Sequence, residues 1–132
     1  MIRKLTNRES DFYALLGPFL ARREVYAELG HPLWDEDTKV WYVEVQDGQV
    51  RGFAALNRLR THVVLCSAYV LPDQRHRGIY TRLLAARVQD AGPGVELRAI
   101  ATAASKVALE QFGFSAVRQR GRYFEMVREA QQ

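Results

Sequence analysis

The chain has 132 residues, of which 48% are hydrophobic, and it carries one cysteine and a formal net charge of +4. This length suits one domain with one hydrophobic core, which we expect to span residues 1–132. The single Cys66 excludes an internal disulfide and a cysteine-rich metal site, and the three histidines lack metal-ligand spacing, so no metal is expected.

The charge of the chain and its first residues narrow the classes of function further. The basic excess is mostly arginine, which fits either a phosphate-bearing partner or a GC-rich genome. No run of Lys and Arg with interleaved aromatics indicates nucleic-acid binding. No window is apolar enough to span a membrane, and Met1–Lys4 is followed by polar residues instead of a signal-peptide core. We therefore expect a cytoplasmic protein that binds no membrane.

The first quarter of the chain predicts one strand and two helices. Residues 2–5 alternate as a short edge strand. Thr6 and Glu9 form a capping-box pattern that predicts the start of a helix. Pro18 should end this helix and begin a second, which should stop at Gly30.

An acidic loop follows at residues 31–37 and contains Trp34. Two interpretations are open. The loop either attracts a cationic amine as part of an acceptor site, or it is a solvated turn with Trp34 docked on the core.

The middle of the chain predicts three strands. Residues 40–46 and 49–56 should form a hairpin, because Asp47-Gly48 is a strong turn signal. A polar link then leads to an apolar strand at 62–71. Cys66 in that strand fits a small core residue better than a nucleophile, since no neighbouring group predicts a lowered pKa.

A short basic loop leads from this strand into a helix and is suited to a phosphate. Backbone N–H groups at a helix N-terminus are free, and the helix dipole adds partial positive charge where they point. Gly78 lets a ligand approach the backbone, and the side chains of Arg75, His76 and Arg77 add positive charge.

The helix at 78–90 has one apolar face, and Arg82 and Arg87 are expected off that face. Arg82 is close enough to the loop to touch a phosphate, or it is simply solvated. A second apolar strand at 95–101 completes a strand–helix–strand unit, which predicts parallel strands and a right-handed crossover. A helix at 102–112 and a hairpin turning near Gly121 end the chain.

The basic loop resembles the cofactor motif of the GCN5-related N-acetyltransferase (GNAT) family, in which a strand ending in Val-x-Pro precedes Arg/Gln-x-x-Gly-x-Gly/Ala. Here these segments read Val70-Leu71-Pro72 and Arg75-His76-Arg77-Gly78-Ile79-Tyr80. Tyr80 departs from the small residue at the last position. Gly113-Phe114 resembles the end of the second family signature, whose tyrosine position holds Leu109.

This resemblance implies an α/β fold of the acyl-CoA N-acyltransferase type, with a mixed, mostly antiparallel sheet flanked by helices. It implies transfer of an acetyl group from acetyl-CoA to a primary amine, and homodimers are common in the family. The strand at 62–71 should splay from its parallel neighbour, and a backbone N–H near Tyr69 or Val70 should polarise the thioester. The alternative is an acyl-CoA-binding or protein-interaction module with the same fold.

The resemblance also implies which residues bind the cofactor, namely the strand end, the loop and the helix start. They are Val70, Leu71, Arg75, His76, Arg77, Gly78, Ile79, Tyr80, Thr81 and Arg82. Backbone N–H groups from 77 to 82, with the Arg75 and Arg77 side chains, should hold the pyrophosphate. The Tyr80 ring must point outward or reshape the pantetheine channel.

The proton-transfer groups are not at the family's usual places, because Leu109 replaces the tyrosine and the strand before the loop has no carboxylate. The catalytic candidates are Glu44, Tyr69 and Tyr123. Glu44 either has a raised pKa in its apolar strand and acts as a base, or is exposed at an edge. Tyr69 either donates a proton to the leaving thiolate or packs in the core.

Overall fold

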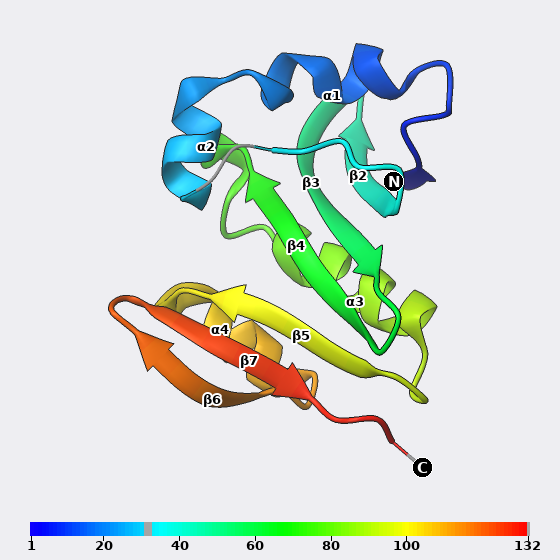
Figure 1. The fold of residues 1–132 in the computed structure, drawn as a ribbon. Helices are drawn as coiled ribbons and strands as arrows, with labels where there is room; N and C mark the ends of the chain where they lie inside the picture. The colour runs from blue at the N-terminus through cyan, green and yellow to red at the C-terminus, as the bar shows by residue number, and fades with distance from the viewer. Residues whose placement is uncertain (31–32, 132) are drawn as a thin grey trace.

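Seven strands form one mixed sheet in the order β1-β2-β3-β4-β5-β7-β6 (Figure 1). The computed structural model describes residues 1–30 and 33–131. Its elements are β1 (Ile2–Leu5), α1 (Phe12–Leu20), α2 (Arg23–Leu29), β2 (Lys39–Gln46), β3 (Gln49–Arg58), β4 (His62–Val70), a 3-10 turn (Pro72–Gln74), α3 (Ile79–Ala91), β5 (Glu96–Ala101), α4 (Ala103–Gln111), β6 (Ser115–Arg120) and β7 (Tyr123–Arg128). Only β4 and β5 pair in parallel within this sheet. The predicted mixed, mostly antiparallel sheet flanked by helices is confirmed.

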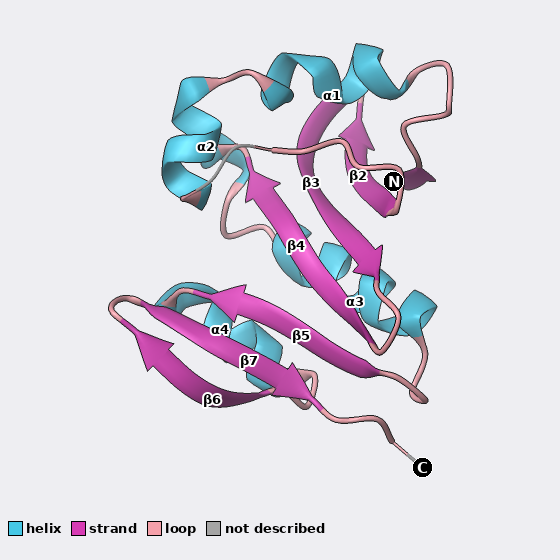
Figure 2. Cartoon of the chain, in the orientation of Figure 1, coloured by secondary structure: helices cyan, strands magenta, loops and turns pink. Residues whose placement is uncertain are grey.

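The helices cover both faces of the sheet (Figure 2). Side chains on a strand alternate between faces. Trp41 and Val43 of β2 accordingly pack with α1 and α2, whereas Tyr42 between them packs with α3. The helix α4 covers β5, β6 and β7. Among the described residues, none of the helices combines the length and the apolar character needed to cross a lipid bilayer.

The first helices differ from the prediction. Glu9 accepts a hydrogen bond from the Thr6 backbone N–H at 2.6 Å, but this contact closes a turn, and α1 begins only at Phe12. Pro18 lies inside α1 instead of ending it. A proline costs one helical hydrogen bond, and the burial of Phe19 in the next position offsets that loss. The second helix, α2, ends at Gly30 with a φ of +84°, as predicted.

The acidic loop also differs in part. Residues 31 and 32 lie outside the described residues. Trp34 is 58% exposed, so its predicted docking on the core is wrong, and the buried side chain is Leu33. Asp35 accepts a hydrogen bond from the Tyr13 hydroxyl, which ties the loop to α1.

The parallel strands β4 and β5 pair only over the first four residues of each strand. The register joins residues 62–65 to residues 96–99, and beyond this point the strands diverge (Figure 1). A bulge interrupts the β3–β4 register between Phe53 and Ala55, and Ser67 opposite has a φ of +55°. A bulge increases local twist and bends its strand. The predicted splay is therefore present.

Candidate active site

A cleft of about 1120 Å³ lies where β4 and β5 part. One wall is the second half of β4, and the other is formed by β5, β7 and the first turns of α4. The loop after β4 and the start of α3 close one end. The cleft therefore gathers residues from both halves of the sheet around backbone that the splay leaves unpaired.

The loop and the start of α3 present backbone donors to this cleft. His76 and Gly78 both have positive φ, +64° and +81°, so the chain curls sharply before α3 begins at Ile79. Within the described residues, no acceptor bonds the backbone N–H of Ile79, Tyr80 or Thr81. Free N–H groups in such a curl at a helix N-terminus bind anions. We call the curl and these three N–H groups the cradle; that it holds a phosphate stays a prediction.

Arg75 lines the cleft, but its guanidinium already has partners within the protein. Its Nη2 is 2.7 Å from both carboxylate oxygens of Glu28 on α2, and its Nε donates to the carbonyl oxygen of Val70 at 2.9 Å. The guanidinium therefore links α2 to the end of β4 and does not point at the phosphate cradle. Leu71 is not part of the cleft wall, and its N–H donates to Arg51 at 3.0 Å.

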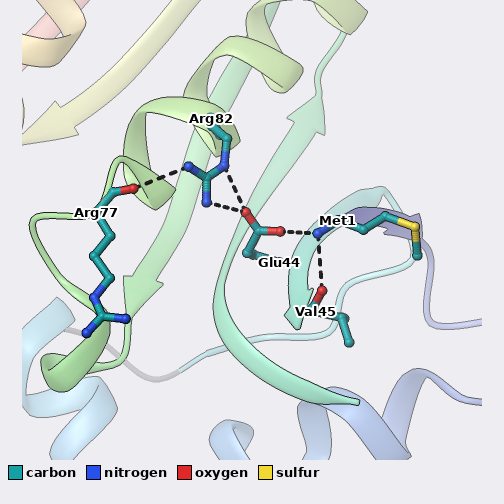
Figure 3. Close-up of polar contacts among 5 residues, drawn as sticks. All are labelled: Met1, Glu44, Val45, Arg77 and Arg82. Carbon is teal, nitrogen blue, oxygen red and sulfur yellow. Dashed lines mark hydrogen bonds and ion pairs between the residues drawn. The ribbon is translucent and has the colours of Figure 1, made fainter. Parts of the chain in front are cut away.

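Arg82 connects the loop to Glu44 on β2 (Figure 3). Its Nε and Nη2 donate to one Glu44 oxygen at 2.9 and 2.7 Å, and its Nη1 donates to the Arg77 carbonyl oxygen at 3.3 Å. The other Glu44 oxygen is 2.6 Å from the α-amino group of Met1. Arg82 and Arg77 do not line the cleft.

Glu44 is neither exposed nor a carboxylate of raised pKa, so both interpretations of its environment were wrong. Its side chain is 2% exposed. Burial opposes its ionisation, but the hydrogen bonds from Met1 and Arg82 outweigh burial and hold the pKa of Glu44 below its ordinary value of 4.5. Glu44 also lies outside the cleft wall.

Two candidate tyrosines do reach the cleft. Tyr69 is 6% exposed, burial raises its pKa, and the Arg75 guanidinium lies 5.6 Å from its ring centre. The Tyr123 hydroxyl accepts a hydrogen bond from Arg122 at 2.9 Å. A Cβ at Gly30 would lie 3.1 Å from that hydroxyl, so Tyr123 reaches from β7 to the end of α2.

Tyr80 lines the cleft, so its ring does not point outward.

Arg87 lies on the buried face of α3, whereas the sequence analysis placed it off that face. It is 2% exposed, and it donates to the carbonyl oxygens of Leu83 and Ala55, each at 3.2 Å. Burial lowers the pKa of Arg87. Its spacing of four residues from Leu83 and from Ala91 placed it on the buried face, and that signal was available.

Three carboxylates reach the cleft wall, and each has an ion-pair partner. Glu28 pairs with Arg75, Glu96 with Arg98, and Glu125 with Arg118 and Arg120. Leu109, at the family's tyrosine position, is buried. Within the described ranges, no group of three or more His, Cys, Asp or Glu side chains is suited to a metal ion.

A sequence model of the acetyltransferase (GNAT) family matches residues 4–114. The chain belongs to the GNAT acetyltransferase family. Members of this family use acetyl-CoA as acyl donor, and the unpaired N–H groups at the start of α3 fit its pyrophosphate. The predicted family, fold and cosubstrate are thereby confirmed.

Solved structures agree with this fold. ElaA from Escherichia coli has a TM-score of 0.78 at 15% identity, with 98% of this chain and 99% of that chain covered. A ribosomal-protein-alanine N-acetyltransferase from Brucella melitensis has a TM-score of 0.70 at 24% identity, covering 98% and 99%. The PaiA N-acetyltransferase of Thermoplasma acidophilum, in complex with coenzyme A, has a TM-score of 0.65 at 15% identity, with 98% of each chain covered. No curated protein sequence matches the chain.

Proposed function

We propose that this protein is an N-acetyltransferase that transfers an acetyl group from acetyl-CoA to a primary amine. One observation carries the proposal: unpaired backbone N–H groups at residues 79–81 close one end of a cleft whose walls are a splayed strand pair. This arrangement suits a long ligand with a pyrophosphate at one end and a reactive group farther along β4. The proposal places the enzyme in the cytoplasm, and a homodimer stays a prediction.

The chain's own residues would divide the binding work. The N–H groups of Ile79, Tyr80 and Thr81 would hold the pyrophosphate, with His76 and Gly78 shaping the curl that aims them. Bound acetyl-CoA supplies the activated acyl group. A backbone N–H near Tyr69 or Val70 would polarise its carbonyl, because both residues line the cleft beyond the last β4–β5 pair.

Tyr69 is the best-placed proton donor. Its raised pKa keeps the hydroxyl protonated at neutral pH, so it can donate to the leaving sulfur. Tyr123 lies across the cleft and would help to orient the amine. Since the cleft carboxylates are already paired, the amine would lose its proton through water, and proximity would supply much of the rate.

A second candidate function is an acyl-CoA-binding module with little catalysis. Two observations favour it: Leu109 occupies the family's tyrosine position, and each cleft carboxylate has a cationic partner.

The first experiment measures thermal unfolding with acetyl-CoA, CoA or ATP. A ligand that binds only the folded state raises the unfolding midpoint. We expect acetyl-CoA and CoA to raise it in the wild type and not in Gly78→Glu, which strains the curl at a φ of +81° and places a carboxylate-bearing side chain next to the Arg82 guanidinium, 3.4 Å from the new Cβ. Gly92→Glu is the matched control, because Gly92 has a φ of +83° at the other end of α3 with open space around it.

The second experiment measures release of the CoA thiol over a panel of amines. Turnover of any amine, together with the midpoint shift, supports the transferase. A shift without turnover supports the binding module. No shift with any CoA compound would overturn both.

A further inference from the structure

Two buried cations flank the β4 bulge, and neither has a carboxylate partner among the described residues. Lys39 at the start of β2 is 5% exposed, and Arg87 of α3 is 2% exposed. Every ion pair in the described chain involves other cations. Burial of an uncompensated charge is costly, so we expect the two positive charges at this position to have a function.

The contacts of the two cations converge on one point of β4. The Lys39 Nζ donates to the Trp34 carbonyl oxygen at 2.9 Å and to the Ser67 Oγ at 3.4 Å. The Arg87 Nη1 donates to the Ala55 carbonyl oxygen at 3.2 Å. Ser67 follows Cys66 in the chain, and Ala55 is the cross-strand partner of Cys66. Both cations therefore contact immediate neighbours of Cys66.

They approach this point from opposite faces of the sheet. Lys39 lies 5.4 Å from the Trp41 ring centre, on the face that α1 and α2 cover. Arg87 belongs to α3, which covers the other face. The bulge thus lies between two positive charges, at the place where β4 leaves β5 and enters the cleft wall.

We propose that Lys39 and Arg87 form an electrostatic pair that stabilises the negative charge developing at the β4 bulge during acyl transfer. This role rests on the proposed function. The amine lone pair forms the new C–N bond, and the carbonyl π pair moves to oxygen. When that pair returns, the C–S bond breaks and its electrons go to sulfur. The ammonium proton passes to water, and the thiolate gains one proton from Tyr69, which water restores.

Both the oxyanion and the thiolate are anions in a partly desolvated cleft. Fixed positive charge stabilises such anions strongly because no solvent reorganisation is needed. Lys39 does not line the cleft, so it acts on these anions only through its electrostatic field. It is therefore a positioning residue and not a catalytic residue. Arg87 does line the cleft.

The lone Cys66 offers a native probe of this field. It is partly exposed, lines the cleft and is the one cysteine of the chain. The charged or titratable groups that act on its thiol are Lys39, Arg87 and Glu36, with Ser67 as a hydrogen-bond partner. Burial raises the pKa of Cys66, and the two cations oppose that rise.

The test titrates Cys66 by its alkylation rate with neutral iodoacetamide across pH. We expect Lys39→Met and Arg87→Met each to raise the measured thiol pKa, so that alkylation near neutral pH slows about tenfold, because the thiolate is the reacting form. Lys106→Met and Arg8→Met remove cations elsewhere and should leave the rate unchanged. An unchanged thiol pKa in both bulge variants would overturn the proposal.

Steady-state kinetics complete the test. Each neutral variant should lose about tenfold in kcat with an unchanged KM for acetyl-CoA, and Lys39→Arg and Arg87→Lys should recover most of it. If Arg87→Met fails to fold, Lys39→Met decides the result. Full kcat in the folded Lys39→Met variant refutes this proposal alone, whereas absence of turnover in the wild type refutes the proposed function and this role with it.

Discussion

Arg82 donates two hydrogen bonds to a single oxygen of Glu44, and this contact ties the middle of β2 to the first turn of α3. Because the same guanidinium also reaches the Arg77 carbonyl oxygen, the connection extends to the loop of the proposed phosphate cradle. A buried carboxylate outside the cleft thus holds one end of the proposed cofactor site in place. Glu44 has a structural role that does not require it to accept a substrate proton.

Replacing Glu44 by glutamine should lower the free energy of unfolding by about 2 kcal/mol at neutral pH, since charge-assisted hydrogen bonds are lost. The folded-state pKa of Glu44 is depressed, so its stabilisation is present above the unfolded-state pKa and is lost as pH falls through the folded-state pKa. Urea unfolding should therefore show that the difference in free energy of unfolding between the wild type and Glu44→Gln narrows below about pH 4.5. A pH-independent difference would contradict this, and the exposed Glu129→Gln is the control.

Gly52 on β3 is where α3 packs against the sheet. A Cβ there would lie 3.1 Å from both the Ile79 Cγ2 and the Tyr69 carbonyl oxygen. Gly52→Ala should cost about 1–2 kcal/mol of stability and weaken acetyl-CoA binding several-fold, because it pushes on the first residue of α3. Gly94→Ala, with open space around it, should change stability by less than about 0.5 kcal/mol. Stability is measured by denaturation and binding by calorimetric titration. If Gly52→Ala and Gly94→Ala had equal effects in both measurements, the close packing at Gly52 would be contradicted.

Tyr69→Phe should lower kcat by about 100-fold with little change in the KM for acetyl-CoA, as expected for loss of a general acid. Because its pKa is raised from 10.0, the wild type should keep its kcat up to about pH 10 without an alkaline decline from this group. Tyr13→Phe is the matched control, because it also removes one tyrosine hydroxyl, the one hydrogen-bonded to Asp35, outside the cleft wall. Unaltered kcat in Tyr69→Phe would leave Tyr69 as a packing residue.

Arg75→Met should keep most of the midpoint rise that acetyl-CoA produces, because the Arg75 side chain is committed to Glu28 and Val70. Its loss should instead loosen α2 against β4 and raise the KM of the amine. Thermal unfolding beside Gly78→Glu separates the two possibilities. A loss of the midpoint shift as complete as in Gly78→Glu would restore the phosphate role that the sequence motif implied.

The order of elements was predictable because its signals are local. Periodicity, the Asp47-Gly48 turn and the glycines that end helices each act within a few residues. The loop was predictable for the same reason, since its donors are backbone groups that need only the curl at Gly78 and a following helix. The family motif added the splay between β4 and β5, which no local pattern specifies.

The side-chain predictions failed where partners are distant in sequence. Glu44 is 38 residues from Arg82, and Arg75 is 47 residues from Glu28. No sequence pattern near Glu44 or Arg75 indicates such a distant partner. Pro18 was misread for a related reason, because the burial of Phe19 against the sheet overrides the local preference of proline. Arg87 is the exception, since its four-residue spacing marked it as buried.

Because β4–β5 pairing ends early, this sheet has more unpaired edges than its two outer strands, β1 and β6. Beyond residue 65 of β4 and residue 99 of β5, the facing sides of these two strands are additional edges. Unpaired strand borders attract further strands from other molecules. A long ligand lying along β4 would shield one of these borders, so acetyl-CoA should also act as a solubilising ligand that keeps concentrated protein from self-association.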